Sequence, residues 1–424
     1  MVAVDDRPEI PEELQRCNER TAAGDGRPPR RRWLRWTALG TGVVVLGAGA
    51  VGWLAYDKLN GNITADSDTA AQLRGYEAER PPASAKNVQN ILLIGSDNRG
   101  GGNREYGADD GTQRSDTTIL LHLAADRKSA TAVSIPRDLM VQVPTCTKED
   151  GSRTQPQFTQ FNYAFEAAGP ACTIRTVERM TDIRIDHHMI LDFTGFKKMV
   201  DAVDGVEVCL PQAVADRDSH LNLAAGRHLL RGEQALGYVR ARKTLGNGSD
   251  TQRMERQQQF LAALVKKVQG NGVLLNPTRL YPLLDAATSS LTTDEGLASL
   301  KGLFNLVRSV RGIPTDKIHF LTVPRQAYAL NINRDELVQP DADRLFGRLR
   351  ADRPVPVRPA PTEQTDTTEY DDPAKDPQTG QTDARGAGRS NSGDEADKPD
   401  HPESATPGPV TTFRGTTADR GICR

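Results

Sequence analysis

Two aspartates and two arginines flank a pair of predicted strands at spacings that suggest a metal and phosphate site. The run Leu92-Leu-Ile-Gly-Ser-Asp97-Asn-Arg99 leaves the first strand, and Arg114-Ser-Asp116 introduces the second. If these strands are antiparallel neighbours, the two carboxylates face each other at one edge of the sheet, with the arginines beside them. Carboxylate oxygens bind divalent cations and arginines bind phosphate, so the group predicts a cation that carries phosphate oxygens. The alternative is a solvated loop of mixed charge.

A second set of charged residues lies near the ends of later predicted elements. Proline fixes the backbone, so Pro136 projects the two residues after it from a stiff strand edge. Arg240 and Arg242 are two residues apart, so they point the same way in an extended segment. Arg253 and Gln257 are four residues apart, so they share one face of a helix. Arginine suits a diphosphate because it stays charged and binds phosphate through two nitrogens. These candidates are Arg137, Asp138, Arg240, Arg242, Arg253 and Gln257.

Short apolar runs alternate with longer helical patterns between residues 86 and 352, which we take as the folded domain. The sequence predicts strands at 90–95, 117–123, 130–135, 189–191, 206–210 and 318–323, and helices at 193–203, 251–268, 277–287 and 294–310. This alternation predicts an α/β fold, a three-layer α/β/α sandwich around a central mixed sheet.

An apolar segment near the start predicts a membrane helix. Residues 36–56 are 21 consecutive residues without a charge, which is long enough to cross a hydrocarbon core of about 30 Å. Arginines between residues 27 and 35 precede it, so the positive-inside rule places the N-terminus in the cytoplasm and the rest outside. We therefore expect a single-pass helix at residues 33–56. A cleaved signal peptide is the alternative, but its apolar region is shorter and ends in small residues.

The remaining segments are too polar to form a core. Residues 1–32 predict a disordered cytoplasmic tail, residues 57–85 a stalk, and residues 353–424 a mostly disordered tail rich in proline and acid. Between Arg358 and Pro409, Tyr370 is the single large apolar side chain. The mean hydropathy of −0.55 agrees with unpacked tails.

Four cysteines follow the apolar segment and are expected in an oxidising compartment. They are Cys146, Cys172, Cys209 and Cys423, which permit three pairings. We favour Cys146 with Cys172, which closes a local loop and leaves Cys209 for Cys423. The alternative is four unpaired, buried cysteines.

Taken together and in this order, these segments resemble the LytR-CpsA-Psr family of cell-envelope proteins. No single motif is specific, but the series is. Besides the segments around Asp97, Asp116 and Arg137, it includes Phe161-Asn-Tyr-Ala164, Val203-Asp-Gly-Val206, Gly232-Glu-Gln-Ala-Leu-Gly-Tyr-Val-Arg-Ala-Arg242 and Asp250-Thr-Gln-Arg253-Met-Glu-Arg256-Gln-Gln258.

The resemblance implies a membrane-anchored phosphotransferase. Such an enzyme moves a glycopolymer, for example a teichoic acid, from a polyprenyl diphosphate carrier to a hydroxyl of peptidoglycan through a phosphodiester. It implies Mg²⁺, or Mn²⁺, on Asp97 and Asp116, with Asp138 and Gln257 orienting arginines or phosphate. An apolar slot for the prenyl chain is expected between the sheet and the helices after residue 193. The arginines that would line the diphosphate are Arg99, Arg114, Arg137, Arg240, Arg242 and Arg253.

Two other functions use the same features differently. A polyprenyl-diphosphate pyrophosphatase needs the same metal and arginines, but its acceptor is water. A non-catalytic envelope regulator is the third hypothesis. A net charge of −2 gives no reason to expect nucleic-acid binding, and residues 1–32 show no helix-turn-helix pattern. The expected partners are therefore the lipid-linked glycopolymer, peptidoglycan and the membrane.

Overall fold

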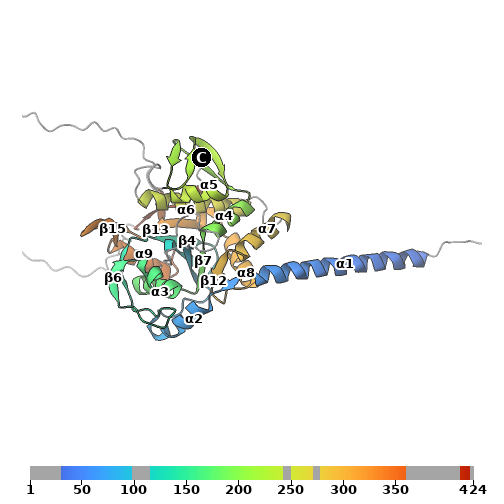
Figure 1. Ribbon diagram of the computed structural model, residues 1–424, viewed down its shortest axis with the longest axis horizontal. Coiled ribbons are helices and arrows are strands. Elements are labelled where there is room, and N and C mark those ends of the chain that lie inside the picture. The colour runs from blue at the N-terminus through green and yellow to red at the C-terminus, as the bar shows by residue number, and fades with distance from the viewer. Residues whose placement is uncertain (1–29, 98–114, 242–249, 271–276, 360–410, 421–424) are drawn as a thin grey trace, which may run out of the picture. The chain divides into compact units, whose positions relative to one another are not determined.

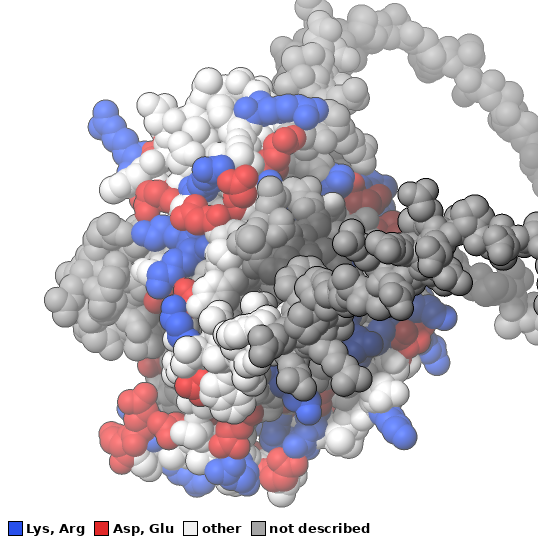
Figure 2. Space-filling view, turned by 90° about the vertical axis from the view of Figure 1, so that its right-hand side faces the viewer, with Lys and Arg blue, Asp and Glu red and all other residues white. Residues whose placement is uncertain are grey.

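The computed structural model describes residues 30–97, 115–241, 250–270, 277–359 and 411–420 (Figure 1). The chain divides into two compact units, Met1–Lys58 and Leu59–Arg424. Basic and acidic side chains are interspersed on the face shown in Figure 2. That mixture agrees with the net charge of −2 and gives this face no field of a single sign.

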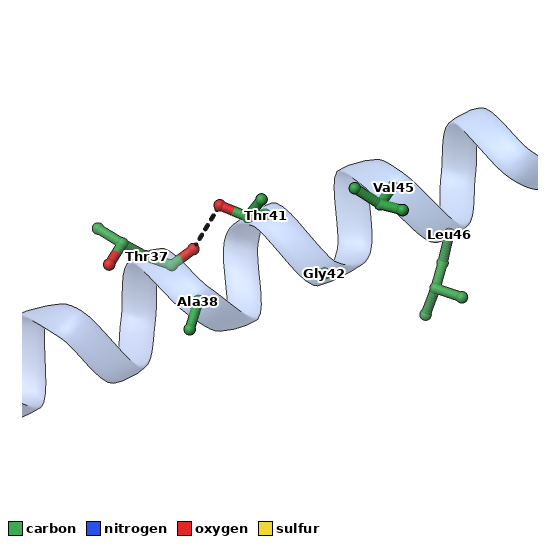
Figure 3. A pocket seen from close by; sticks show the side chains of 6 residues that line it. All are labelled: Thr37, Ala38, Thr41, Gly42, Val45 and Leu46. Carbon is green, nitrogen blue, oxygen red and sulfur yellow. Dashed lines mark hydrogen bonds between the residues drawn. The ribbon is translucent and has the colours of Figure 1, made fainter.

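The first unit consists of most of helix α1 (Arg30–Gly61). Within this helix, Trp36–Gly61 is long and apolar enough to cross a membrane, with a mean hydropathy of 1.8 over its most apolar window. The Thr41 hydroxyl donates to the carbonyl of Thr37 at 2.8 Å (Figure 3), so the polar group is satisfied within the helix. The helix fits a single-pass anchor and continues past the predicted end at residue 56.

A nine-stranded mixed sheet forms the centre of the second unit. Its order is β1 (Thr64–Ala65), β12 (Leu291–Thr293), β7 (His187–Leu191), β2 (Gln89–Ser96), β3 (Ser115–Leu123), β4 (Ala130–Ile135), β13 (Ile318–Thr322), β17 (Phe413–Thr417) and β16 (Val357–Pro359). Strands β2 and β3 are antiparallel neighbours, whereas β2 pairs in parallel with β7. The predicted mixed sheet is therefore confirmed.

Helices cover both faces of this sheet. Leu92 points to one face, where it packs with residues of α3 (Tyr163–Thr181) and α9 (Asp341–Arg350). Ile91, its neighbour in the strand, points to the other face, toward α6 (Asp250–Gly270) and α8 (Leu300–Arg311). Because the side chains of successive strand residues point to opposite faces of the sheet, one apolar run contributes to the hydrophobic cores on both faces. The predicted three-layer arrangement is thus observed (Figure 1).

The other elements lie outside this sheet. The predicted strand at 206–210 is observed as β8 (Val206–Leu210), but it pairs with β11 (Gly226–Leu230) in a separate two-stranded ribbon. The helix predicted from residue 294 begins at Leu300, because the Ser299 hydroxyl accepts the Gly302 N–H at 3.0 Å and caps it. The remaining elements are α2 (Ser67–Arg74), α4 (Phe193–Ala202), α5 (Gly232–Arg240), α7 (Pro277–Thr288), β5 (Met140–Val143), β6 (Gln157–Gln160), β8 (Val206–Leu210), β9 (Val214–Asp216), β10 (Leu221–Leu223), β11 (Gly226–Leu230), β14 (Arg325–Tyr328) and β15 (Asn331–Leu337).

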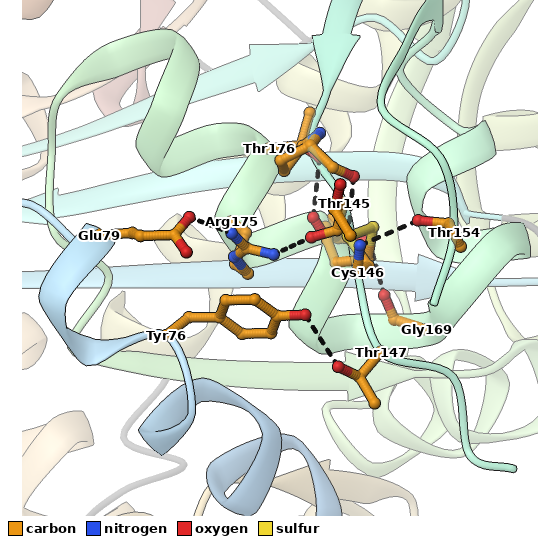
Figure 4. The surroundings of a disulfide bond; sticks show 12 residues. Tyr76, Glu79, Thr145, Cys146, Thr147, Thr154, Gly169, Arg175 and Thr176 are labelled. Atoms are coloured by element: carbon orange, nitrogen blue, oxygen red, sulfur yellow. Dashed lines mark hydrogen bonds and ion pairs between the residues drawn. A yellow bond between two sulfur atoms is a disulfide. The ribbon is translucent and has the colours of Figure 1, made fainter. Parts of the chain in front are cut away.

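The predicted stalk at 57–85 is wrong, since residues 59–85 belong to the second unit and contact its other elements. β1 pairs with β12, and Leu73 and Tyr76 are buried. The guanidinium of Arg175 lies 3.4 Å from the centroid of the Tyr76 ring (Figure 4). The stabilising partners come from distant parts of the chain, so the local pattern did not reveal them.

The predicted boundary at residue 353 also needs correction. Val355 and Phe413 are buried, and β16 and β17 extend the sheet beyond β13. These strands are short and lie next to a long polar stretch, so the composition of the whole region did not indicate them. Residues 360–410 lie outside the described residues.

Cys146 and Cys172 form a disulfide, the pairing favoured from their spacing (Figure 4). It joins the segment after β5 to α3, and both cysteines are buried. The Cys146 N–H donates to the Thr154 hydroxyl at 2.9 Å. Cys209 is also disulfide-bonded, whereas Cys423 lies outside the described residues.

Two histidine–aspartate contacts hold the β1 edge of the sheet to β7. His188 Nε2 lies 3.0 Å from Asp66 Oδ2, and His187 Nδ1 lies 3.0 Å from Asp294 Oδ1. Burial lowers the pKa of His187, but the hydrogen bond and charge of Asp294 outweigh burial and leave that pKa raised.

We expect this contact to make stability depend on pH. A raised histidine pKa stabilises the fold fully below the unfolded pKa of about 6.5, and this contribution is lost as the pH rises through the folded pKa. A His187→Gln variant of the full chain should melt up to about 3 °C below the native chain near pH 5.5, since a partly exposed pair contributes about 1 kcal/mol. Circular-dichroism melts should show the difference shrinking toward about pH 9. A constant difference would contradict the assignment.

Candidate active site

A pocket of about 790 Å³ lies between the central sheet and helices α4, α5 and α6. Its polar lining includes Ser96, Asp116, Thr117, Arg137, Asp192, Asp216, Asp218, Arg240, Arg253 and Gln257. Its apolar lining includes Leu93, Ile119, Met189, Leu191, Phe193, Phe196, Met199, Leu236, Val239, Phe260, Leu261 and Leu291. The pocket therefore combines a charged wall with an apolar one.

The charged wall contains a chain of ion pairs at the ends of β3 and β4. Arg137 donates from Nη1 to Asp116 Oδ1 at 2.7 Å and from Nε to Asp138 Oδ2 at 3.2 Å. Arg334 on β15 donates to the other oxygen of Asp138 at 2.8 Å. Asp138 does not line the pocket, but it fixes the guanidinium that does. The antiparallel register of β3 and β4 brings the start of one strand beside the end of the other.

Helices α5 and α6 supply the other cations. Arg240, the last residue of α5, lies over the Phe193 ring, with 4.7 Å from Cζ to the ring centroid. Gln257 Nε2 donates to the carbonyl of Val239 at 3.1 Å, and Arg256 donates to that of Ala241. These two bonds tie α6 to the end of α5. Arg253 and Gln257 both face the pocket because they are one helical turn apart.

Five of the predicted site residues thus line one pocket: Asp116, Arg137, Arg240, Arg253 and Gln257. Asp97 directly follows β2, whose residues Gly95 and Ser96 also line it. Arg99, Arg114 and Arg242 lie outside the described residues.

The apolar wall lies between the sheet and the helices after residue 193, the region in which the family resemblance implies a slot for a prenyl chain. Leu93 on β2 and Met189 on β7 contribute from the sheet, while Phe196 and Met199 contribute from α4. Phe260 on α6, which also lines the pocket, is fully buried, and its ring centroid lies 5.6 Å from that of Phe196. The wall is aliphatic and aromatic, so it favours an apolar ligand.

Sequence reasoning missed four charged residues at or beside this site. Asp192 caps α4 by accepting the Gly195 N–H at 2.7 Å, and its place before a predicted helix was a usable signal. Asp216 and Asp218 reach the pocket from β9 and the turn after it. Arg334 lies on a polar hairpin nearly two hundred residues from Asp138, and no local signal marks it.

Comparisons with known proteins show the family of this chain. The LytR_cpsA_psr family model matches residues 55–350, and the chain belongs to that family. It is 32% identical over 308 residues to the cell wall biosynthesis protein LcpA of Corynebacterium glutamicum, covering 66% of this chain. The match spans 58% of the length of that relative.

Two further relatives extend the comparison. The chain is 28% identical over 325 residues to the polyisoprenyl-teichoic acid–peptidoglycan teichoic acid transferase TagT of Bacillus subtilis, covering 73% of this chain and 94% of TagT. The solved LytR-Csp2A-Psr enzyme from Actinomyces oris matches with a TM-score of 0.51 at 22% identity, covering 64% of this chain and 93% of that one. At that identity the solved structure supports the fold.

Proposed function

We propose that this protein is a phosphotransferase that moves a glycopolymer from a polyprenyl diphosphate to a hydroxyl of peptidoglycan. The observation that carries the proposal is that arginines and an apolar wall line the same pocket. That pairing matches a ligand in which a diphosphate is joined to a hydrocarbon chain. The relative TagT is named for a transfer of this kind.

The proposed reaction is a displacement at the phosphorus attached to the glycopolymer. The acceptor hydroxyl oxygen forms a new bond to this phosphorus, the anhydride bond breaks, and polyprenyl phosphate leaves while the hydroxyl proton is released. Phosphoryl transfer depends on positioning and charge neutralisation. Arg137, Arg240 and Arg253 would bind the phosphate oxygens, and the apolar wall would hold the prenyl chain.

Mg²⁺ is part of this proposal, with Asp97 and Asp116 as ligands and Mn²⁺ as a substitute. Within the described residues, no group of three or more His, Cys, Asp or Glu side chains could hold a metal. Mg²⁺ commonly binds one or two carboxylates together with substrate phosphates, so a pair of aspartates beside arginines fits it. The ion would neutralise phosphate charge when bound.

The proposed topology has the N-terminus in the cytoplasm and the domain outside. The arginines before α1 support this orientation through the positive-inside rule. The disulfide between Cys146 and Cys172 also supports it, since disulfides persist in oxidising compartments.

Reconstitution of the full chain tests the function. The protein in vesicles is given a polyprenyl diphosphate-linked glycopolymer and peptidoglycan, with Mg²⁺ or with EDTA. We expect polymer linked to peptidoglycan by a phosphodiester, and about 10³-fold less of it with EDTA. Release of polyprenyl phosphate without linked polymer would support the pyrophosphatase instead. If neither linked polymer nor polyprenyl phosphate is formed, both functions are contradicted.

Replacing Arg334 tests how Arg137 is held. An Arg334→Gln variant should lower kcat about 10- to 100-fold with little change in KM, because a hydrogen bond to a charged group contributes about 1.5–3 kcal/mol. Arg227, which pairs with Glu207 at 3.2 Å on the exposed surface, provides the control. An Arg227→Gln variant should keep native kinetics. If the two variants have the same kcat, Arg334 does not contribute to the reaction.

A further inference from the structure

Helix α8 exposes apolar and basic side chains on its outer face. Phe304 and Val307 are 58% and 40% exposed, whereas Leu303 is buried against the domain. Lys301, Arg308 and Arg311 are exposed too, and α8 contains no acidic residue. A short helix with this outer face is typical of one that lies in a membrane interface.

The start of α8 is hydrogen-bonded to Asn60 in the last turn of α1, a turn that belongs to the second unit. The Leu300 N–H donates to Asn60 Oδ1 at 3.1 Å. In the same region, Asn62 Nδ2 donates to Asp285 Oδ1 on α7 at 3.2 Å, and Leu59 is buried. Asn60 follows the apolar stretch that ends at Tyr56 by four residues, or about 6 Å of helix. Chain connectivity therefore keeps the start of α8 within roughly 10 Å of the end of the apolar stretch, and so near the membrane surface if α1 spans it.

We propose that the exposed face of α8 is a second membrane contact, which docks the domain on the lipid headgroups. Phe304 and Val307 would enter the interface, and the three basic residues would attract anionic lipid. The attraction would come from the three basic side chains of α8 itself, a helix that contains no acidic residue. The contact would set the orientation of the domain, which a single helix leaves free to rotate.

This docking would also bring the apolar wall of the pocket close to the bilayer. Helix α7, which is tied to Asn62, packs on α4. Helix α4 carries Phe196 and Met199 of that wall. This consequence rests on the proposed function, but the membrane contact itself does not.

A second exposed apolar site provides the matched control. Leu330, in the turn between β14 and β15, is 84% exposed, and Ile332 on β15 is 82% exposed. Within the second unit, β15 and α8 lie on opposite sides (Figure 1). A domain docked through α8 therefore holds this hairpin in water.

Lipid quenching of a dye on the full chain distinguishes the two sites. Val307→Cys and Ile332→Cys are made separately in a Cys17→Ser background, labelled with an environment-sensitive dye and reconstituted into phosphatidylglycerol vesicles that contain nitroxide-labelled lipid. We expect quenching at 307 at least about twice that at 332, with a blue shift at 307 only. Equal quenching, or stronger quenching at 332, overturns the proposal.

The basic residues are tested in the same vesicles. Lys301→Gln, Arg308→Gln and Arg311→Gln together should reduce quenching at 307 by about half or more, and phosphatidylcholine vesicles should do the same to the native sequence. Unchanged quenching in both overturns the role of these residues. No substrate is present, so failure of the proposed transferase would not affect either result.

Discussion

An Arg137→Ala variant should lose transfer activity by about 10³-fold or more while the domain stays folded. Arg137 lines the pocket and is held from two sides by Asp116 and Asp138. A preorganised donor that stabilises transition-state charge is worth about 10²–10³ in rate, and an arginine in phosphoryl transfer up to about 10⁵. The side chain is 23% exposed, so its loss leaves no cavity in a core. Single-turnover kinetics with the lipid-linked polymer would measure the effect.

Arg137→Lys is the control for this prediction. Lysine keeps the charge but lacks the planar pair of donors, so it should recover part of the rate and not all of it. The melting temperature of both variants should remain within a few degrees of the native value. Native turnover in Arg137→Ala would remove the assigned site.

An Arg80→Ala variant should destabilise the domain by about 3–5 kcal/mol. Arg80 lies in the segment predicted to be a stalk, but its Nε and Nη2 bind the carboxylate of Glu178 at 2.7–3.1 Å. Glu178 is 3% exposed. Removal of one partner leaves a buried charge without its counter-ion, which is costly. Urea unfolding of the detergent-solubilised chain would measure this loss.

A surface arginine provides the comparison. Arg344 pairs with Asp341 at 2.8 Å, and both side chains are at least 40% exposed. Arg344→Ala should change the free energy of unfolding by less than about 1 kcal/mol. If Arg80→Ala behaves in the same way, residues 62–85 do not belong to the cooperative domain.

Sequence patterns determined the parts of this protein whose signals are local. The uncharged run before Asp57 defines a helix of membrane length, and alternation in strands such as β2 defines a sheet covered on both faces. Residues close in sequence to strand and helix ends, such as Arg137 and Gln257, were identified because their spacing fixes their direction. These features depend on backbone geometry, which neighbouring residues set.

Tertiary structure decided what distant residues do to each other. Arg334 supports Asp138, Arg80 pairs with Glu178, and strand β17 pairs with β13 next to the edge strand β16. Each contact joins segments separated by roughly a hundred residues or more, so no pattern within one segment predicts it. The physical reason is that burial and ion pairing depend on which surfaces meet in space, and polar segments such as 57–85 become ordered only when a distant partner covers them.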